Sequence, residues 1–333
     1  MADLFFSIPL FTVIAMPFAI IAFAIMLDAI AGEPDFLWSR LPHPVVVFGK
    51  AISFLEKRLN QRHFSGRQRR FFGTISLILW VGIALIIGFA IEAAFSVLPE
   101  IAAFIVEIIV VAILLAGRSL IDHIKAVAAP LSSGDITGAR FAVSMIVGRD
   151  TSKMDDSDIA RAAIETGAEN LSDGVFAPAI WYLIGGLPLM LAYKMVNTAD
   201  SMVGYKSARY YAFGWASAVF DDVVNYFPAR LTGWLIIAVG KNPKQALSVM
   251  RADADHHASP NAGYPEAAMA GSLGIRLGGA RAYRNRTLDL PAMMPAGRDA
   301  LSAADILASI KILWFALAAS AILCLLIAFT LSA

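Results

Sequence analysis

Long apolar runs separated by polar, charge-rich segments dominate the chain. Four runs meet or approach the about 20 residues that a helix needs to cross a bilayer, and they cover residues 5–27, 71–93, 101–116 and 312–329. Two further apolar segments, residues 175–196 and 226–239, are shorter or are interrupted by proline and glycine. Broken backbone at membrane depth is tolerated when it is buried in protein or lines a cavity, so both segments fit re-entrant helices.

The polar segments between these runs favour helices as well. Residues 159–170 place apolar and polar side chains at helical spacing, and no alternating run is long enough for a sheet. The pattern predicts an all-α, polytopic integral membrane protein with four to six membrane helices. Residues 1–333 are expected to form one membrane-embedded domain, with a large helical region over residues 117–304.

The distribution of lysine and arginine predicts the orientation. Cytoplasmic loops carry an excess of these residues, and the connection between the first two runs holds eight of them: Arg40, Lys50, Lys57, Arg58, Arg62, Arg67, Arg69 and Arg70. Residues 96–100 contain none, whereas basic residues return after residue 117. We therefore expect a cell inner-membrane protein with both termini outside and residues 117–304 in the cytoplasm.

Composition narrows the class further. The chain is 58% hydrophobic and 16% charged, which is too apolar for a soluble domain and too charged for a bare helix bundle. Its net charge of +1 and the lack of a basic patch with interleaved aromatics argue against nucleic acid as a partner. The single cysteine, Cys324, lies in an apolar run, so an intrachain disulfide and a cysteine zinc site are excluded.

One compact polar string surrounds Arg149. This residue follows Gly148 and precedes Asp150 and Thr151, which puts a cation, a carboxylate and a hydroxyl on one turn. Such a turn could hold a phosphate through the guanidinium and backbone N–H groups. The alternative is a helix N-cap formed by Asp150 or Thr151.

A second string is acidic. Glu165 and Glu169 are four residues apart and share a helix face, with Asp173 one turn further on. Like charges at this spacing repel each other, and a Mg²⁺ ion would remove the conflict, since it takes one or two carboxylates and leaves other positions to water and phosphates. A solvated acidic face is the alternative.

Two more strings follow the interrupted apolar segment. Lys194, Asn197 and Asp200 come first, where Lys194 could neutralise a phosphate or could be a snorkelling lysine at a helix end. Asp221 and Asp222 come next and resemble a second metal and phosphate site, with Arg230 as a further cation. An Asp222–Arg230 ion pair is the alternative.

The remaining candidates lie at the two ends of the polar region. Asp28, Glu33 and His43 directly follow the first apolar run. His256 and His257 lack the spacing of a helical zinc site. Asn261 lies in a proline-rich turn loop suited to substrate contact or to connection alone.

The order and spacing of these strings resemble the adenosylcobinamide-phosphate synthase family of cobalamin biosynthesis, CobD/CbiB. The likeness runs from Asp28 to about Tyr283. It is carried by Gly32-Glu33-Pro34, His43-Pro44-Val45, Gly148-Arg149-Asp150-Thr151, Ala168-Glu169-Asn170, Asp173-Gly174, Asn197-Thr198, Asp200 to Tyr205, Asp221-Asp222-Val223, Pro228-Ala229-Arg230, Ser259 to Pro265 and Leu277-Gly278-Gly279. The residues before Asp221 and after Gly279 depart from the family pattern, which affects local substrate contacts and the identity of the amine.

The resemblance implies an enzyme that uses ATP and Mg²⁺ to join adenosylcobyric acid to aminopropanol or its O-phosphate. From their chemistry, the residues expected to organise Mg²⁺ are Glu165, Glu169, Asp173, Asp221 and Asp222. Arg149, Asp150, Lys194, Asn197, Arg230 and Asn261 are expected to bind the nucleotide. The catalytic candidates are Asp200, for the incoming ammonium, with Glu165, Glu169 and Asp222. A homo-oligomer and contact with other membrane enzymes of the pathway stay open.

The alternatives are a non-enzymatic transporter or sensor of the AmpE-like type and a different phosphate-handling membrane transferase. Transport would place ionisable residues within the spans. Only Glu92 and Glu107 lie within the four runs, whereas the carboxylate-rich strings lie outside them. This distribution favours the enzyme.

Overall fold

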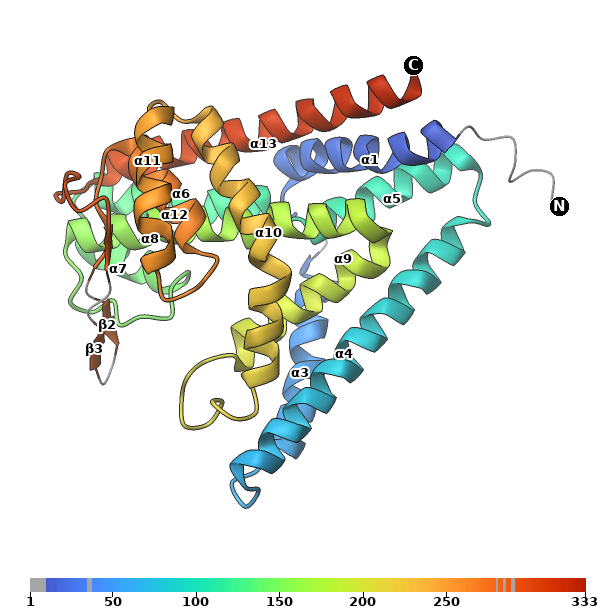
Figure 1. Ribbon diagram of the computed structural model, residues 1–333, viewed down its shortest axis with the longest axis horizontal. Helices are drawn as coiled ribbons and strands as arrows, with labels where there is room; N and C mark the ends of the chain where they lie inside the picture. Colours follow the sequence, from blue (N-terminus) through green and yellow to red (C-terminus); the bar gives the residue numbers. More distant parts are fainter. Residues whose placement is uncertain (1–9, 35–37, 280, 284–285, 289–290) are drawn as a thin grey trace. The chain divides into compact units, whose positions relative to one another are not determined.

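The computed structural model describes residues 10–34, 38–279, 281–283, 286–288 and 291–333 (Figure 1). Helices make up nearly all of its regular structure, so the prediction of an all-α fold is confirmed. The chain divides into two compact units. The first contains the described residues up to Ala116 together with Ala177–Val224 and Ala321–Ala333, and the second contains Gly117–Phe176 and Asn225–Ser320.

The first unit is built from long apolar helices. These are α1 (Leu10–Ala31), α3 (Pro44–Leu59), α4 (Gly66–Phe95), α5 (Glu100–Leu114), α9 (Ala177–Val203), the start of α10 (Trp215–Val239) and the end of α13 (Ala303–Ser332). Helix α4 packs along α9, and α1 packs along α5 (Figure 1). The approach of α4 to α9 requires Gly88, because a Cβ atom there would lie 2.4 Å from the Cα of Pro188.

The second unit surrounds a buried helix. Besides the rest of α10 and α13 it contains α6 (Gly117–Ser132), α7 (Ile136–Ser144), α8 (Asp156–Leu171), the π-helix η1 (Ser172–Phe176), α11 (Pro243–Asp253), the 3-10 helix η2 (Ala254–His256) and α12 (Gly263–Leu273). Helix α8 contacts α6, α7 and α12 and is almost wholly buried after its first turn. Asp155 caps its start, and Asp158 returns the bond to the cap residue.

The described part of the second unit also contains four short strands. β1 (Leu277–Gly278) pairs antiparallel with β4 (Ala292–Met293), and β2 (Arg281–Tyr283) pairs antiparallel with β3 (Arg286–Leu288). Leu277 lies opposite Met293, and Arg281 lies opposite Leu288. The sheets are too small to change the fold class.

Among the residues that the structure describes, four helical stretches are long and apolar enough to cross a membrane: Gly66–Phe95, Glu100–Ser132, Asp156–Val203 and Ala303–Ser332. They contain the predicted spans 71–93, 101–116 and 312–329, and the third contains the interrupted segment 175–196. Part of the predicted span 5–27 lies outside the described residues, and α1 has a shorter apolar stretch at Ala15–Ala31. The segment 226–239 forms the second half of α10.

Helix α9 is broken in its middle. Gly185 has φ −159° and ψ 37°, and Gly186 has φ 64° and ψ −159°, so neither residue is helical. The helix turns sharply at this point (Figure 1). The carboxylate of Glu92 accepts a hydrogen bond of 3.0 Å from the backbone N–H of Leu187, the first residue after the break. Glu92 therefore satisfies one of the backbone donors that a helix start leaves open.

Candidate functional site

Arg149 and Glu165 form a buried ion pair in the second unit. The guanidinium nitrogen Nη2 of Arg149 lies 2.6 Å from Oε2 of Glu165, whose side chain is only 1% exposed. The other oxygen, Oε1, accepts a hydrogen bond of 2.7 Å from the backbone N–H of Gly278. Gly278 has φ 72°, a backbone conformation that favours glycine. A cation and a backbone donor thus share one buried carboxylate.

This arrangement changes the expected roles of both residues. A buried carboxylate needs a cation and hydrogen bonds to offset the loss of water, and Arg149 and Gly278 supply them. Both oxygens of Glu165 are therefore engaged by protein groups before any metal ion arrives. Arg149, whose side chain is 15% exposed, is held in place by Glu165 and remains partly accessible.

Asp150 closes a turn and does not cap a helix. Its Oδ1 accepts hydrogen bonds from the backbone N–H of Ser152 at 3.0 Å and from the Ser152 hydroxyl at 2.7 Å. The cap of the following helix α8 is Asp155. The alternative that Asp150 or Thr151 caps this helix is therefore wrong.

Glu169 and Asp173 lie at the end of α8 and in η1. Glu169 is on the last turn of α8, and Asp173 is the second residue of the π-helical turn that follows. Short π-helical turns inside longer helices are frequent at functional sites. Both side chains are partly exposed, unlike Glu165.

Arg230 and Asn261 lie elsewhere in the second unit. The guanidinium of Arg230 stacks between two tyrosine rings, 3.4 Å from the centroid of Tyr226 and 4.0 Å from that of Tyr264. Asn261, which is 5% exposed, lies in the loop before α12, and its backbone N–H bonds to the hydroxyl of Ser259. Nη1 of Arg230 also donates a hydrogen bond of 2.7 Å to the carbonyl of Tyr226, so these contacts hold the guanidinium in place.

The first unit brings other predicted residues together across two helices. Lys194, Asn197 and Asp200 lie on the second half of α9, after the break. The amide of Asn197 donates a hydrogen bond of 3.3 Å to Oδ1 of Asp221, the first of the two adjacent aspartates of α10. This contact joins the two strings, which the sequence analysis treats as separate sites.

Asp200 is held at the C-terminal end of α9. A Cβ atom on Gly204 would lie 1.8 Å from Oδ1 of Asp200, so the carboxylate occupies the space that glycine leaves. The backbone N–H of Gly204 donates to the carbonyl of Asp200 at 2.7 Å. Any larger residue at position 204 would displace the carboxylate.

Asp222 has an altered acidity. Burial raises the pKa of its carboxyl group above the ordinary value, and the positive charge of Lys206 opposes the shift. Its neighbour Asp221 is buried at 8% exposure. A carboxylate with a raised pKa gains from a cation, because the cation stabilises its charged form.

The carboxylates can be tested against the chemistry of Mg²⁺. In the described part of the chain, no three His, Cys, Asp or Glu side chains converge to enclose a metal ion by themselves. Mg²⁺ usually takes only one or two carboxylates and completes its shell with water and phosphate oxygens. Asp221, whose Oδ1 accepts from the Asn197 amide, and the adjacent Asp222 supply two carboxylates, the number that such an open site uses.

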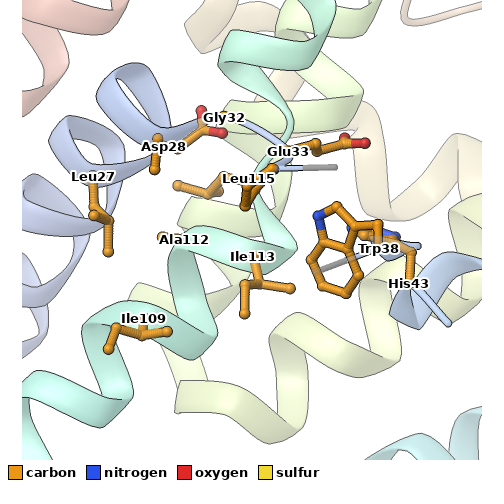
Figure 2. A pocket seen from close by; sticks show the side chains of 12 residues that line it. Leu27, Asp28, Gly32, Glu33, Trp38, His43, Ile109, Ala112, Ile113 and Leu115 are labelled. Carbon is orange, nitrogen blue, oxygen red and sulfur yellow. The ribbon is translucent and has the colours of Figure 1, made fainter. Parts of the chain in front are cut away.

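A cavity of about 200 Å³ lies beside the end of α1 (Figure 2). Asp28, Glu33, Trp38 and His43 supply its polar groups, and α5 supplies an apolar wall. The carboxylates of Asp28 and Glu33 lie on the same side of the cavity (Figure 2). Asp28 is 5% exposed.

Trp38 gives this cavity an open hydrogen-bond donor. The indole ring packs edge-on against His43, with centroids 4.6 Å apart. Its buried Nε1 has no hydrogen-bond partner among the described residues. Burial lowers the pKa of His43, with a smaller contribution from Lys194, against the opposing effects of Glu33 and a backbone hydrogen bond at Ile113. Nδ1 of His43 accepts a hydrogen bond of 3.3 Å from the backbone N–H of Val45, and this bond fixes the orientation of the imidazole ring.

Two residues of these sites were not predicted from the sequence. Trp38 could have been noticed as an aromatic donor between Glu33 and His43. Glu92 was noticed only as an ionisable residue within a span, and nothing in the sequence relates it to Leu187, which is 95 residues away.

Comparison with known proteins gives a consistent result. The family model described as CobD/Cbib protein matches residues 21–313. "Cobalamin biosynthesis protein CobD" of Sinorhizobium sp is 46% identical over 301 residues, which cover 89% of this chain and 93% of the relative. The protein of the same name from Rhizobium meliloti (strain 1021) is 45% identical, with 89% and 92% covered. That of Rhodobacter capsulatus is 45% identical, with 82% and 85% covered.

No solved structure matches the chain. The family model nevertheless covers most of the chain. The alignments to relatives of 45% and 46% identity also cover almost the full length of those relatives. The resemblance drawn from the motifs is confirmed, and the chain belongs to the CobD/CbiB family of cobalamin biosynthesis proteins.

Proposed function

We propose that the chain is an ATP-dependent ligase that joins adenosylcobyric acid to aminopropanol or its O-phosphate through an amide bond. The observation that carries this proposal is the family match over residues 21–313, which includes all the polar strings that hold the candidate residues. The relatives are named for cobalamin biosynthesis, which is the pathway of this reaction.

The chemistry defines what the site must supply. A carboxylate is a poor acyl donor at neutral pH, because its leaving group would be oxide. A carboxylate oxygen of the corrinoid therefore attacks the terminal phosphorus of ATP, and ADP leaves. The amine nitrogen then attacks the carbonyl carbon of the acyl phosphate, phosphate leaves, and the ammonium proton passes to a base. Positioning and neutralisation of charge provide most of the catalysis in such phosphoryl transfers.

We assign the metal to the first unit. Asp221 and Asp222 would hold Mg²⁺, and the ion would neutralise phosphate charge when it is bound. Lys194 and Asn197 lie on the neighbouring half of α9 and would contact phosphate oxygens. Asp200 would accept the proton of the ammonium group.

The second unit carries candidate ligand-binding residues of its own. Arg149 would bind a phosphate or carboxylate oxygen, with Glu165 holding the guanidinium in place. Glu169 and Asp173 remain candidates for metal or amine binding. Asp150, Arg230 and Asn261 remain candidates for contacts with the nucleotide.

The cavity at Trp38 suits the amine. An acidic rim attracts an ammonium group, and an oxygen on the adjacent carbon could accept the indole N–H. The apolar wall of α5 would contact the short carbon chain. We therefore assign Asp28 to binding of the ammonium and Asp200 to its deprotonation.

The test is ADP release by detergent-purified protein given Mg-ATP, adenosylcobyric acid and aminopropanol phosphate. Each component is omitted in turn, the unphosphorylated amine is tried in parallel, and the corrinoid product is followed by mass. We expect ADP and the amide to appear together and only in the full mixture. Folded protein that forms neither product would refute the ligase and favour an AmpE-like transporter or sensor.

A further inference from the structure

Helix α3 has two contrasting faces. Phe48, Ile52 and Glu56 are buried against the rest of the first unit. On the opposite face, Val46 is 49% exposed and Phe54 is 52% exposed. The rest of the first unit therefore leaves part of the apolar surface of α3 uncovered.

A groove of about 620 Å³ runs along the exposed face. Its lining residues are Val46, Gly49, Lys50, Ser53, Phe54 and Lys57 of α3, with Met202 from the end of α9. Residues 46, 50, 54 and 57 follow one another at helical spacing, so apolar and basic side chains alternate down one stripe. Gly49 leaves space at the bottom of the groove. A Cβ atom added at this position would lie 3.4 Å from the sulfur of Met202 and would fill that space.

Within the residues that the structure describes, neither Lys50 nor Lys57 has an ion-pair partner. The only acidic residue between positions 38 and 70 is Glu56, on the buried face. Its carboxylate is taken by Arg209, with Nε at 2.9 Å and Nη2 at 3.0 Å. The groove is therefore both apolar and cationic.

The neighbouring helix gives the groove a membrane setting. Helix α3 packs against α4, which can cross a membrane and which begins with Arg67, Arg69 and Arg70. Basic residues at the end of a span lie at the level of the lipid headgroups on the cytoplasmic side, where anionic lipids concentrate. At that level, the two lysines of the groove can contact a lipid phosphate, and its apolar residues can contact the acyl chain below that phosphate.

We propose that the α3 groove binds one anionic phospholipid. The phosphate would lie between the ammonium groups of Lys50 and Lys57, whose four-carbon stems let both reach it, and an acyl chain would lie along Val46, Phe54 and Met202. Each lysine near an anionic headgroup contributes a factor of roughly 5 to binding. The two together give roughly 25-fold.

The experiment is native mass spectrometry of the full-length protein released from nanodiscs that contain equal amounts of phosphatidylglycerol and phosphatidylcholine with identical acyl chains. We expect the protein to retain phosphatidylglycerol at least about 10-fold over phosphatidylcholine. The double variant K50Q/K57Q should lose this preference, and K50R/K57R should keep it. The matched control is K241Q/K244Q, which removes two exposed lysines elsewhere and should leave retention unchanged.

Further arms separate a lipid from a soluble phosphate ligand. Soluble glycerol phosphate in large excess should not displace the lipid, because it lacks the acyl chain. Displacement by glycerol phosphate, equal retention of both lipids, or unchanged retention in K50Q/K57Q would each overturn the proposal. Circular dichroism and gel filtration of every variant verify its fold. The assay needs neither ATP nor corrinoid, so its result is independent of the ligase activity.

Discussion

At the scale of single residues, Glu165 illustrates how burial decides the use of a carboxylate. The sequence places it on one helix face with Glu169, and that pattern favours a shared metal ion. The fold instead buries Glu165 against Arg149 and Gly278, while Glu169 stays partly exposed. Residues 16 and 113 positions away in sequence decide this difference, so local spacing could not predict it.

Replacing Arg149 by alanine should destabilise the protein. Glu165 would keep a buried charge without its cation, and such losses cost about 3–5 kcal/mol. Thermal unfolding in detergent measures the change. The control is Arg118→Ala, which breaks an exposed pair with Asp122 and should cost below about 1 kcal/mol. Equal effects of the two variants would contradict the role given to the buried pair.

The double variant R149M/E165M adds a second comparison. It removes the charge and its counterion together, so it should be more stable than Arg149→Ala. If it is as unstable as the single variant, lost packing and the lost acceptor of the Gly278 N–H, and not charge, account for the instability.

Asp222 should make the protein less stable as pH rises. Its folded-state pKa is raised by burial, so the folded protein binds the proton more tightly than the unfolded chain does. The stabilising effect of the bound proton is present below the unfolded pKa and is lost as pH rises through the folded value. Asp222→Asn should therefore be more stable than the parent at pH 7 and equal to it in acid.

Denaturant unfolding from acid to neutral pH, without Mg²⁺, measures this difference. Ligase activity of Asp222→Asn should fall at the same time, because the amide is a poor substitute for a metal-binding carboxylate. A stability difference that persists unchanged in acid would show that the carboxyl group does not titrate as inferred.

Trp38→Phe should weaken amine binding with little effect on folding. The ring and its contact with His43 remain, and only the unpaired N–H is lost. We expect KM for the amine to rise about 5-fold, as for the loss of one hydrogen bond, with KM for the corrinoid unchanged.

Asp28→Asn should also raise KM for the amine, whereas Asp200→Asn should lower kcat. Similar effects on both substrates would place the amine elsewhere.

At the scale of elements, the break in α9 determines where the second half-helix begins. That half carries Lys194, Asn197 and Asp200. Glycines and prolines in the sequence predict an interruption at residues 175–196, since they disfavour a straight helix. The role of Glu92 depends on the packing of α4 against α9, which no local pattern encodes.

Glu92→Ala should destabilise α9 by about 1–3 kcal/mol, because the N–H of Leu187 loses its acceptor. Glu92→Gln keeps an oxygen acceptor and should be close to the parent protein. Thermal unfolding and ligase turnover, measured on both variants, separate the hydrogen bond from the charge. If Glu92→Gln is as damaged as Glu92→Ala, the negative charge itself is required.

At the scale of the whole molecule, apolar runs and basic loops predicted the class of protein, because bilayer thickness and lipid charge act on composition directly. The helices at Gly66–Phe95 and Ala303–Ser332 enclose the predicted spans 71–93 and 312–329. The division into two compact units was not predicted, because both are assembled from stretches far apart in sequence.

Orientation can be tested with the single cysteine. After Cys324→Ala, a new thiol at Ser332→Cys should react with a membrane-impermeant maleimide in intact spheroplasts. A thiol at Arg62→Cys should react only after the membrane is opened, because the basic connection is expected in the cytoplasm. The opposite pattern would reverse the predicted topology and place residues 117–304 outside.

The bond between Glu165 and Gly278 also has a consequence for synthesis on the ribosome. The two residues are 113 positions apart, so at about 5–20 residues per second Gly278 is made roughly 6 to 23 seconds after Glu165. Arg149, which is made before Glu165, is available from the start. The nascent chain can therefore pair this acid with a cation while it waits for the backbone N–H that completes the site.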